Sequence, residues 1–251
     1  MDVVENNLLI VWNNIMETNR QNLVARIYNL ENQIFITNEI NIRSIVDNNN
    51  PIYFDSISQN NNFIINWREQ NLLHASQNQV PYYLTYARAL TTSGSFVTNK
   101  TLLNFSTYSN NNNTPNTTFT NPIIHTINNN VIVSVWNNLK SLYMEFKILD
   151  INLNILKTKN TSYNSNKKIV TYNITDIDTS YFYFIQTFTS NDIRYDISIT
   201  KITTQLEIIF THSIYNCNNQ IQSTNLIRLE KNKYALTWSE INNGIPKVKL
   251  A

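Results

Sequence analysis

One phrase of this sequence recurs, and a recurring phrase constrains the fold more than any single residue does. In its clearest copy, residues 121–138, an Asn-Pro pair opens a short apolar strand, three asparagines form a turn, and a second apolar strand ends on a tryptophan. Residues 50–67 repeat this order, and residues 224–238 repeat it in a weaker form. The chain is therefore predicted to consist of copies of one strand-turn-strand unit.

An aromatic residue ends the second strand of each unit and sets the period of the repeat. The intervals between successive markers are 55, 69, 52 and 50 positions. The longest interval contains an extended loop at 68–80 and a tract of Ser, Asn, Thr and Pro at 107–121. Without those two segments the period is about 50 residues, with four short strands per unit and no helical periodicity. The markers are Trp12, Trp67, Trp136, Phe188 and Trp238.

A four-stranded antiparallel sheet of this size cannot bury both of its faces alone, but such sheets bury one another when they stack around an axis. We therefore predict an all-β fold, a β-propeller of about five four-stranded antiparallel blades in a single domain, residues 1–251, with 107–121 as an insertion loop. No strand is expected before Leu8, and the last unit stops after its third strand. The ring is thus either closed by imperfect blades or part of a larger propeller. The predicted units are 8–46, 50–106, 121–160, 168–212 and 223–251.

The marker aromatics are predicted to be wedges between neighbouring blades, because a large ring there adds roughly 150–250 Å² of buried surface. Phe188 retains most of that area at a position where the other units carry tryptophan, which favours a packing role over a chemical one. The alternative, a platform on which sugars stack, requires exposed rings.

The composition excludes several classes of protein. Only 14% of the residues are charged and the net charge is +2, so no basic surface for nucleic acid is expected. The apolar runs have strand length, so no membrane insertion is expected, and the N-terminus has no signal-peptide pattern. The single cysteine, Cys217, excludes an internal disulfide and is compatible with a reducing compartment or with a virion or surface particle.

Asparagine supplies roughly one residue in six, whereas glycine occurs only twice. Because Asn, Ile and Tyr have codons rich in A and T, this bias indicates an A+T-rich genome. It also has a structural consequence, since asparagine tolerates the left-handed backbone region better than other residues with a side chain. Asparagine is therefore predicted to take the positive-φ turn positions that glycine usually fills.

The unit resembles the propeller-type repeats of large bacterial surface and secreted proteins. That resemblance is carried by Asn121 and Pro122, the strand-turn-strand segment that follows them and ends on Trp136, and the alternating strand 142–150 with its Asp/Asn-rich turn. It covers nearly the whole chain and implies a propeller architecture. The sequence departs from those repeats in lacking turn glycines and the Asp-rich calcium loops that many of them carry.

No metal or cofactor site is predicted. Asp176 and Asp178 form an isolated acidic pair without the glycine or the closing glutamate of a calcium loop. The histidines, His74, His125 and His212, are scattered one to a unit, and Cys217 has no neighbouring cysteine. His125 alternates with apolar residues and is interpreted as a structural histidine. Two glycines also cannot build a nucleotide-binding loop or a nucleophile elbow.

The enzyme alternative is a glycoside hydrolase, because propellers can gather carboxylates at their central channel. Such hydrolysis needs an acid and a base about 5–9 Å apart. Asp55 is the one candidate in a first strand, which in a propeller lines the channel. The carboxylates considered are Asp55, Glu69, Glu145, Asp196, Glu207 and Glu240.

The favoured hypothesis is a non-enzymatic binding or structural module of a surface- or virion-associated protein. In a propeller the loops after the marker strands gather on one face, so residues distant in sequence can bind a protein or glycan together. The alternatives are that these loops are solvated turns, or that the chain is a structural component without a site. The predicted binding residues are Asn14, Arg68, Glu69, Asn138, Asn191 and Glu240, with Ser190 beside them.

Overall fold

The protein is described by a computed structural model, which places the chain in strands and short connections. None of the described residues is helical, as the sequence predicts. The predicted insertion loop at 107–121 lies almost entirely outside the described residues. The described residues are 2–15, 21–43, 50–71, 82–107, 123–127, 130–136, 143–162, 168–176, 180–190, 194–230 and 233–251.

The strands form five antiparallel sheets that follow one another along the chain. Sheet A contains β1 (Asp2–Val4), β2 (Asn7–Ile15), β3 (Gln21–Asn29), β4 (Ile34–Phe35) and β5 (Ile40–Asn41). Sheet B contains β6 (Asn50–Gln59), β7 (Asn62–Asn71), β8 (Tyr82–Thr91) and β9 (Thr101–Thr107). Sheet C contains β10 (Ile123–Ile127), β11 (Asn130–Trp136), β12 (Tyr143–Leu149) and β13 (Ile155–Ser162). Sheet D contains β14 (Lys168–Asp176), β15 (Tyr181–Ser190), β16 (Arg194–Thr203) and β17 (Ile208–Cys217), and sheet E contains β18 (Gln220–Glu230), β19 (Lys233–Asn242) and β20 (Ile245–Leu250).

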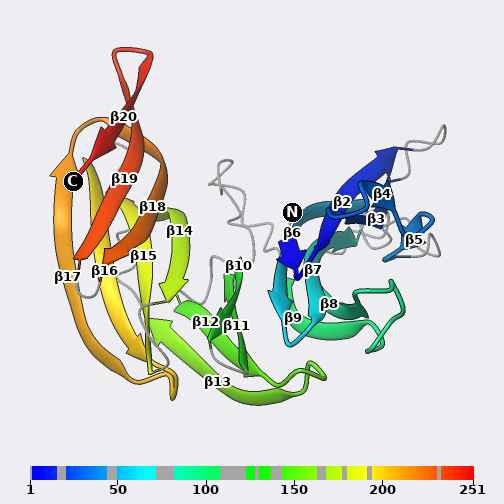
Figure 1. The fold of residues 1–251 in the computed structure, drawn as a ribbon. Helices are drawn as coiled ribbons and strands as arrows, with labels where there is room; N and C mark the ends of the chain where they lie inside the picture. The colour runs from blue at the N-terminus through cyan, green and yellow to red at the C-terminus, as the bar shows by residue number, and fades with distance from the viewer. Residues whose placement is uncertain are drawn as a thin grey trace.

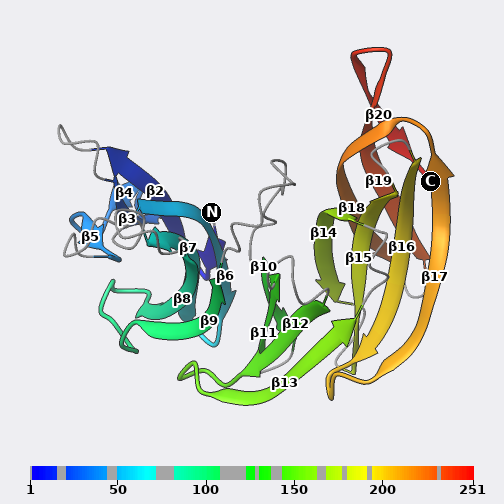
Figure 2. The same cartoon turned by 180° about the vertical axis from the view of Figure 1, so that it is seen from behind.

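The sheets are arranged as the blades of a β-propeller. Within sheets B, C and D the strand order follows the sequence, so each sheet is an up-and-down meander whose first strand lies innermost. The first strands contact those of neighbouring sheets, as β6 does with β10 and β14 does with β18. Figures 1 and 2 show the sheets following an arc, with sheets A and B on one side, sheet C in the middle and sheets D and E on the other side. The packing of A on B, B on C, C on D and D on E makes A and E the two ends of this arc. The predicted fold class is therefore confirmed: four sheets carry at least four strands, and sheet E carries three.

Two details correct the sequence analysis. Asp2–Val4 pairs with β2, so the first sheet does have an innermost strand ahead of Leu8. That strand has only three residues, too few for a periodic pattern to show in the sequence. Strand β7 continues past its marker to Asn71, so residues 68–71 belong to a strand and not to the predicted loop. They pair with β8 as far as Tyr82, and this ladder holds them extended.

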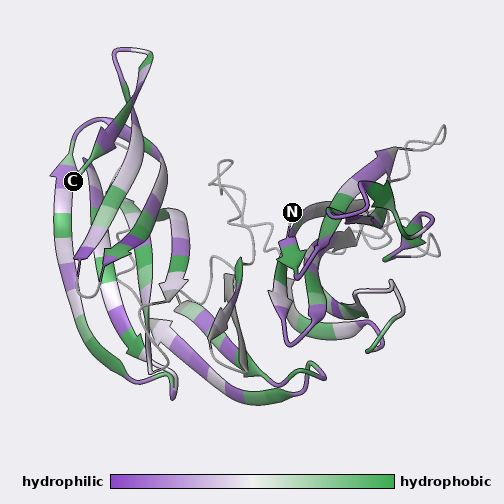
Figure 3. Ribbon diagram, in the orientation of Figure 1, coloured by the Kyte–Doolittle hydropathy of each residue, from purple (hydrophilic) through white to green (hydrophobic). Residues whose placement is uncertain are grey.

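The core lies between successive sheets, where the apolar side chains of one sheet pack on those of the next. The strands that supply these side chains carry both apolar and polar residues (Figure 3). Four clusters of buried side chains join sheet A to B, B to C, C to D and D to E. Trp67 belongs to the first of these, Phe188 to the third and Trp238 to the fourth. Each of these three rings packs against the sheet that precedes its own.

The marker aromatics differ in burial according to their neighbours. Trp67, Trp238 and Phe188 are buried, with exposed fractions of 0%, 6% and 7%. Trp12 is half-buried, because no described sheet precedes sheet A. Trp136 ends β11 opposite Met144, and its side chain lies outside the described part of the chain. For three markers, then, the predicted wedge role agrees with where the ring lies.

Positive-φ residues other than glycine occur in exposed turns and in turns with a buried side chain, and Glu5 and Gln33 fill two of the exposed ones without asparagine. Asn60 and Asn61 form the β6–β7 turn with φ of 46° and 60°, and Asn243 precedes Gly244 in the β19–β20 turn, so asparagine acts there as predicted. In the turns between third and fourth strands, Leu153 and Leu206 adopt φ of 63° and 61°. Both leucine side chains are buried, at 1% exposure. Tertiary burial holds these leucines in a conformation that their own backbone preference disfavours.

Trp67 and Trp12 occupy equivalent positions of the repeat, but replacing them should lower the free energy of unfolding by different amounts. Changing Trp67→Ala removes a fully buried ring from the A–B core and should lower the free energy of unfolding by about 3–5 kcal/mol. Changing Trp12→Ala, the matched control at the equivalent position of sheet A, should lower it by only about 1–2 kcal/mol, because that ring is half-buried. Urea unfolding followed by circular dichroism measures both. Equal losses would contradict the wedge role.

Candidate functional site

The predicted binding residue Glu69 lies at the centre of a buried polar network between sheets A and B. Glu69 was expected on a loop, but it is the eighth residue of the ten-residue strand β7 and is 1% exposed. Side chains two residues apart on a strand point to the same face. Glu69 therefore follows Trp67 into the seam between the sheets.

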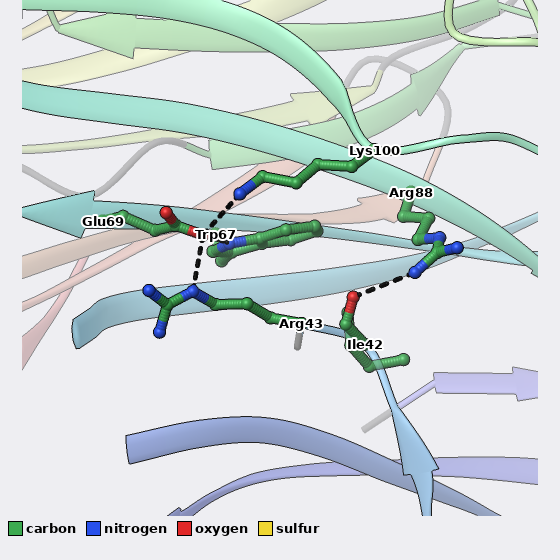
Figure 4. A network of polar contacts seen from close by, with 6 residues as sticks. All are labelled: Ile42, Arg43, Trp67, Glu69, Arg88 and Lys100. Atoms are coloured by element: carbon green, nitrogen blue, oxygen red, sulfur yellow. Dashed lines mark hydrogen bonds and ion pairs between the residues drawn. The ribbon is translucent and has the colours of Figure 1, made fainter. Parts of the chain in front are cut away.

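One carboxylate oxygen of Glu69 collects three partners (Figure 4). The indole Nε1 of Trp67 donates to Oε1 at 2.6 Å, Arg43 Nε lies 2.9 Å from the same atom, and Lys100 Nζ lies 3.0 Å from it. Arg43 follows the last strand of sheet A, whereas Trp67 lies in β7 of sheet B and Lys100 directly precedes β9 of the same sheet. The carboxylate thus ties two sheets together by charge-assisted hydrogen bonds.

Neighbouring cations complete this seam. Lys100 Nζ lies 3.7 Å from the centroid of the Tyr86 ring, a cation–π contact next to the ion pair. Arg88 Nη1 donates to the carbonyl of Ile42 at 3.2 Å, so it holds the segment that carries Arg43. The backbone of Ile42 and Arg43 is fixed in turn by hydrogen bonds from their amides to the carbonyl of Leu23. The network is a rigid internal joint.

A weaker copy of the joint lies between sheets D and E. Glu240, two residues after Trp238, accepts from the Trp238 indole at 3.4 Å and from the Tyr215 hydroxyl at 3.3 Å. Lys249 of the same sheet lies 3.6 Å away, and Asn219 donates to the carboxylate at 3.4 Å. The contacts are longer than at Glu69, and Lys249 is half-exposed. The predicted binding residue Glu240 is therefore also buried inside the fold.

The pattern that reveals these joints is present in the sequence but was not used. Trp67-Arg-Glu69 and Trp238-Ser-Glu240 share the spacing Trp-x-Glu. In a strand this spacing places the carboxylate on the face of a buried tryptophan. A buried carboxylate must then find donors, which predicts a partner from the adjoining sheet.

The other predicted binding residues do not form a common site among the described residues. Asn14 is half-buried in β2, and Arg68 is buried in β7 with its guanidinium carbon 5.2 Å from the centroid of the Tyr53 ring. Asn138 and Asn191 lie outside the described residues, whereas Ser190 ends β15. The expectation that Asn14, Arg68, Glu69 and Glu240 lie on loops is wrong, since the strands continue past their markers and pair through these positions.

Two carboxylates, Asp2 and Asp55, lie on the innermost strands of sheets A and B, which contact each other. Burial raises the pKa of Asp55 in β6, and the nearby charge of Asp2 in β1 raises it further. Burial also raises the pKa of Asp2, whose carboxylate accepts hydrogen bonds from Ser58 and Ser56. Asp2 lies on an innermost strand, β1, that the sequence did not predict, so it was not among the expected carboxylates.

The hydrogen bonds of Asp55 have a structural counterpart elsewhere in the chain. Asp55 Oδ1 accepts from the Ser56 amide at 2.9 Å, and Oδ2 accepts from the Ile124 amide of the next sheet at 3.5 Å. In sheet D, Asn173 Oδ1 accepts from the amide of the residue after it at 2.8 Å, and its Nδ2 donates to Asn225 of the next sheet at 3.0 Å. A neutral amide thus holds adjoining inner strands together in one place as a carboxylate does in another.

The remaining carboxylates considered for hydrolysis are dispersed over the sheets. Glu145 of β12 pairs with Lys147 at 2.8 Å, and Asp196 of β16 lies 3.7 Å from Arg194. Glu207 lies just before β17, with its amide donating to Thr203. Within the described residues, no three of His, Cys, Asp or Glu gather closely enough to hold a metal ion. No helix long and apolar enough to cross a membrane occurs in the part of the chain that the structure describes.

Comparison with known proteins identifies the fold alone. No family model matches the chain, and no curated protein matches its sequence. A protein of unknown function from Dyadobacter fermentans has a similar structure, with a TM-score of 0.60, 10% identity, and coverage of 98% of this chain and 75% of that one. A xylan β-1,4-xylosidase from Bacillus halodurans has a TM-score of 0.50 at 9% identity, and a β-1,3-galactosidase has 0.50 at 8%.

The coverage of these structures is unequal. This chain is matched over 99% of its length by both glycosidases, yet it spans only 51% of the xylosidase and 54% of the galactosidase. The propeller part of the predicted resemblance is therefore supported. No family model and no sequence match relates the chain to surface proteins.

The Glu69 joint predicts a large stability effect. Changing Glu69→Gln leaves Arg43 and Lys100 without their carboxylate in a buried seam, which should lower the free energy of unfolding by about 3–5 kcal/mol. The matched control, Glu240→Gln, should lower it by about 1 kcal/mol or less, because its cation Lys249 is half-exposed. Chemical denaturation of both variants provides the measurement. A larger loss at Glu240 than at Glu69 would disprove the assignment.

Asp55 predicts a pH dependence of stability. Because its folded-state pKa is raised, ionisation disfavours folding above that raised pKa, and the penalty disappears well below 3.8, where the carboxyl is protonated in both states. The variant Asp55→Asn should therefore unfold at a higher temperature than the wild type at pH 7, should lose that advantage as the pH falls from the raised pKa towards 3.8, and should have none well below 3.8. Thermal unfolding across this range, with Asp196→Asn as control, tests the sign.

Proposed function

We propose that this chain is a non-enzymatic β-propeller module that makes protein or glycan contacts in a surface- or virion-associated protein. The observation that carries the proposal is that acidic side chains which hydrolysis would need are instead buried and bonded within the fold. Glu69 and Glu240 are used inside the fold as joints between sheets. A buried carboxylate that is held by an indole and by donors from the adjoining sheet is not free to act on a substrate.

The inner strands support the same proposal. The hydrogen bonds of Asp55 to backbone amides resemble those of Asn173, an amide that can neither donate nor accept a proton for catalysis. This equivalence favours a structural role for Asp55. The strands around it then serve mainly to hold one rigid scaffold, from which loops can contact a partner.

The loop face after the marker strands remains the proposed binding face. The loops of this face follow the second strand of each sheet. These strands are β2, β7, β11, β15 and β19, and they end at Ile15, Asn71, Trp136, Ser190 and Asn242. Exposed polar residues next to these ends, such as Arg194 and Asn243, are suited to hydrogen-bond a glycan or a protein surface. Rigid strands that present variable loops are the usual arrangement for binding.

A glycoside hydrolase is the second candidate, favoured by one observation. Asp2 and Asp55 lie near each other on adjoining inner strands, and burial raises the pKa of both carboxyls. A raised pKa is what a general acid in glycoside hydrolysis requires. Two structural neighbours are named as glycosidases, a likeness of fold at 8–9% identity.

Hydrolysis assays separate the two candidates. The full chain, incubated with aryl β-xylosides, β-galactosides and α-arabinosides, should release no more aryl alcohol than the double variant Asp2→Asn/Asp55→Asn. A rate present in the wild type and absent from the double variant would overturn the binding proposal in favour of the enzyme.

Binding itself needs a positive test. On an array of glycans, the wild type should bind a subset that a variant of the loop face, Arg194→Ala/Asn243→Ala, binds at least about tenfold more weakly, a change of about 1.4 kcal/mol. The matched control is Lys157→Ala in β13, the outermost strand of sheet C. Equal binding by the loop-face variant and the wild type would contradict the assignment of this face.

A further inference from the structure

The two ends of the arc expose faces that in the rest of the fold are covered by a neighbouring sheet. The four interfaces between successive sheets are built in the same way. Each sheet packs one of its faces on the preceding sheet and its other face on the following sheet. Sheet A uses Leu9 and Val11 against sheet B, so the alternate residues of β2 point away from it. Sheet E uses Leu236 and Trp238 against sheet D, so the alternate residues of β19 also point away.

The outer face of sheet A is apolar and partly covered. Its β2 residues Leu8, Ile10 and Trp12 are half-buried, and Val3, which pairs with Leu8, is 47% exposed. Tyr28 pairs with both Leu8 and Phe35 and packs edge-on against the Phe35 ring at 5.2 Å. Phe35 itself is 43% exposed. This face, called here the Trp12 face, carries the marker aromatic that the other sheets bury.

The outer face of sheet E is apolar and more exposed. Val248 and Leu250 of β20 are 81% and 72% exposed, and they pair with Ser239 and Thr237 of β19. Ile227 of β18, 48% exposed, pairs with Ala235 on the same face. Third strands elsewhere are different: β16 of sheet D is largely buried, whereas all six residues of β20 are exposed. This face is called here the Val248 face.

We propose that the Trp12 face of one copy of this chain docks on the Val248 face of a second copy, head to tail. The two faces are the two halves of the interface that the fold already uses four times within the chain. A marker aromatic from one sheet packs on the far face of the sheet before it, as Trp238 does on sheet D through Ile185 and Ile197. For Trp12, the Val248 face of the second copy would provide the surface that a preceding sheet provides for the other marker aromatics.

The arc itself favours a second copy over closure within one chain. Both views place sheets A and B on one side of the molecule and sheets D and E on the other, with sheet C between them, so sheets A and E lie on opposite sides (Figures 1 and 2). Four packed cores and the Glu69 and Glu240 joints fix the angle between successive sheets. Bringing the ends together would require several close-packed interfaces to shift at once. A second copy meets both faces without such a change.

Such an interface is heterologous, because two different surfaces meet, and this makes its mutational pattern distinctive. Sedimentation velocity of the full chain over a range of concentrations should show association. Trp12→Ala and Val248→Lys should each weaken it by roughly thirtyfold or more, the effect expected of a central contact. The matched control Leu156→Lys, at a 57% exposed residue of β13, should leave association unchanged.

Mixing the variants tests the pairing of the two faces. A Trp12→Ala copy retains an intact Val248 face, and a Val248→Lys copy retains an intact Trp12 face. An equimolar mixture should therefore regain a heterodimer that neither variant forms alone. If Trp12→Ala abolishes association but Val248→Lys does not, the Trp12 faces pair with each other and the proposal is overturned.

Two further outcomes would also overturn it. The contribution of Trp12 to the fluorescence is the difference between the wild type and the variant Trp12→Phe. If the chain stays monomeric at all concentrations and acrylamide quenches this contribution, both faces are free. A monomer in which the same difference shows Trp12 protected has closed its arc within one chain. Neither outcome depends on the variants Trp12→Ala or Val248→Lys folding.

Discussion

The packing of one aromatic ring on the preceding sheet is the contact on which this fold depends. A four-stranded sheet leaves two apolar faces, and the fold covers them by pressing each sheet on its neighbour. Trp67, Phe188 and Trp238 are large aromatic side chains near the ends of their second strands, and each packs in the seam with the sheet before it. Once these seams are filled, the angle between sheets is set and the arc follows.

Burial of the rings also decides where the polar residues must lie. The indole nitrogen of a buried tryptophan needs an acceptor, and a glutamate two residues later on the same face supplies it. That glutamate is then itself buried and draws a cation or hydroxyl group from the adjoining sheets. The joints at Glu69 and Glu240 are therefore consequences of aromatic packing, and they remove two of the acidic residues that a catalytic site would have needed.

The same constraint explains the unusual turns. Leu153 and Leu206 adopt positive φ because their side chains are buried between or beneath sheets, so the hydrophobic gain outweighs the backbone strain. Asparagine fills the positive-φ positions only where a turn is exposed, as at Asn60 and Asn61. At the buried turns the packing of the core requires an apolar side chain, which leucine supplies.

Much of this fold could be predicted from the sequence, whereas the site could not. Period-2 alternation and the recurring markers sufficed for an all-β propeller, since both are local patterns with a direct physical meaning. The three-residue strand β1 escaped detection, and with it Asp2 and the carboxylate pair. The end of β7 was also misplaced, because polar residues such as Arg68 and Glu69 suggest a loop unless the adjoining sheet that buries them is known.

The sequence by itself determined which residues alternate, where the units repeat, and that the sheets must cover one another. The tertiary structure alone decided whether a polar side chain meets solvent or a partner. Glu69 and Glu207 are both glutamates near strand ends, yet one is buried under three partners and the other is exposed. The difference depends on residues contributed by other sheets, such as Arg43 and Lys100, and such long-range contacts leave no mark in the local sequence pattern.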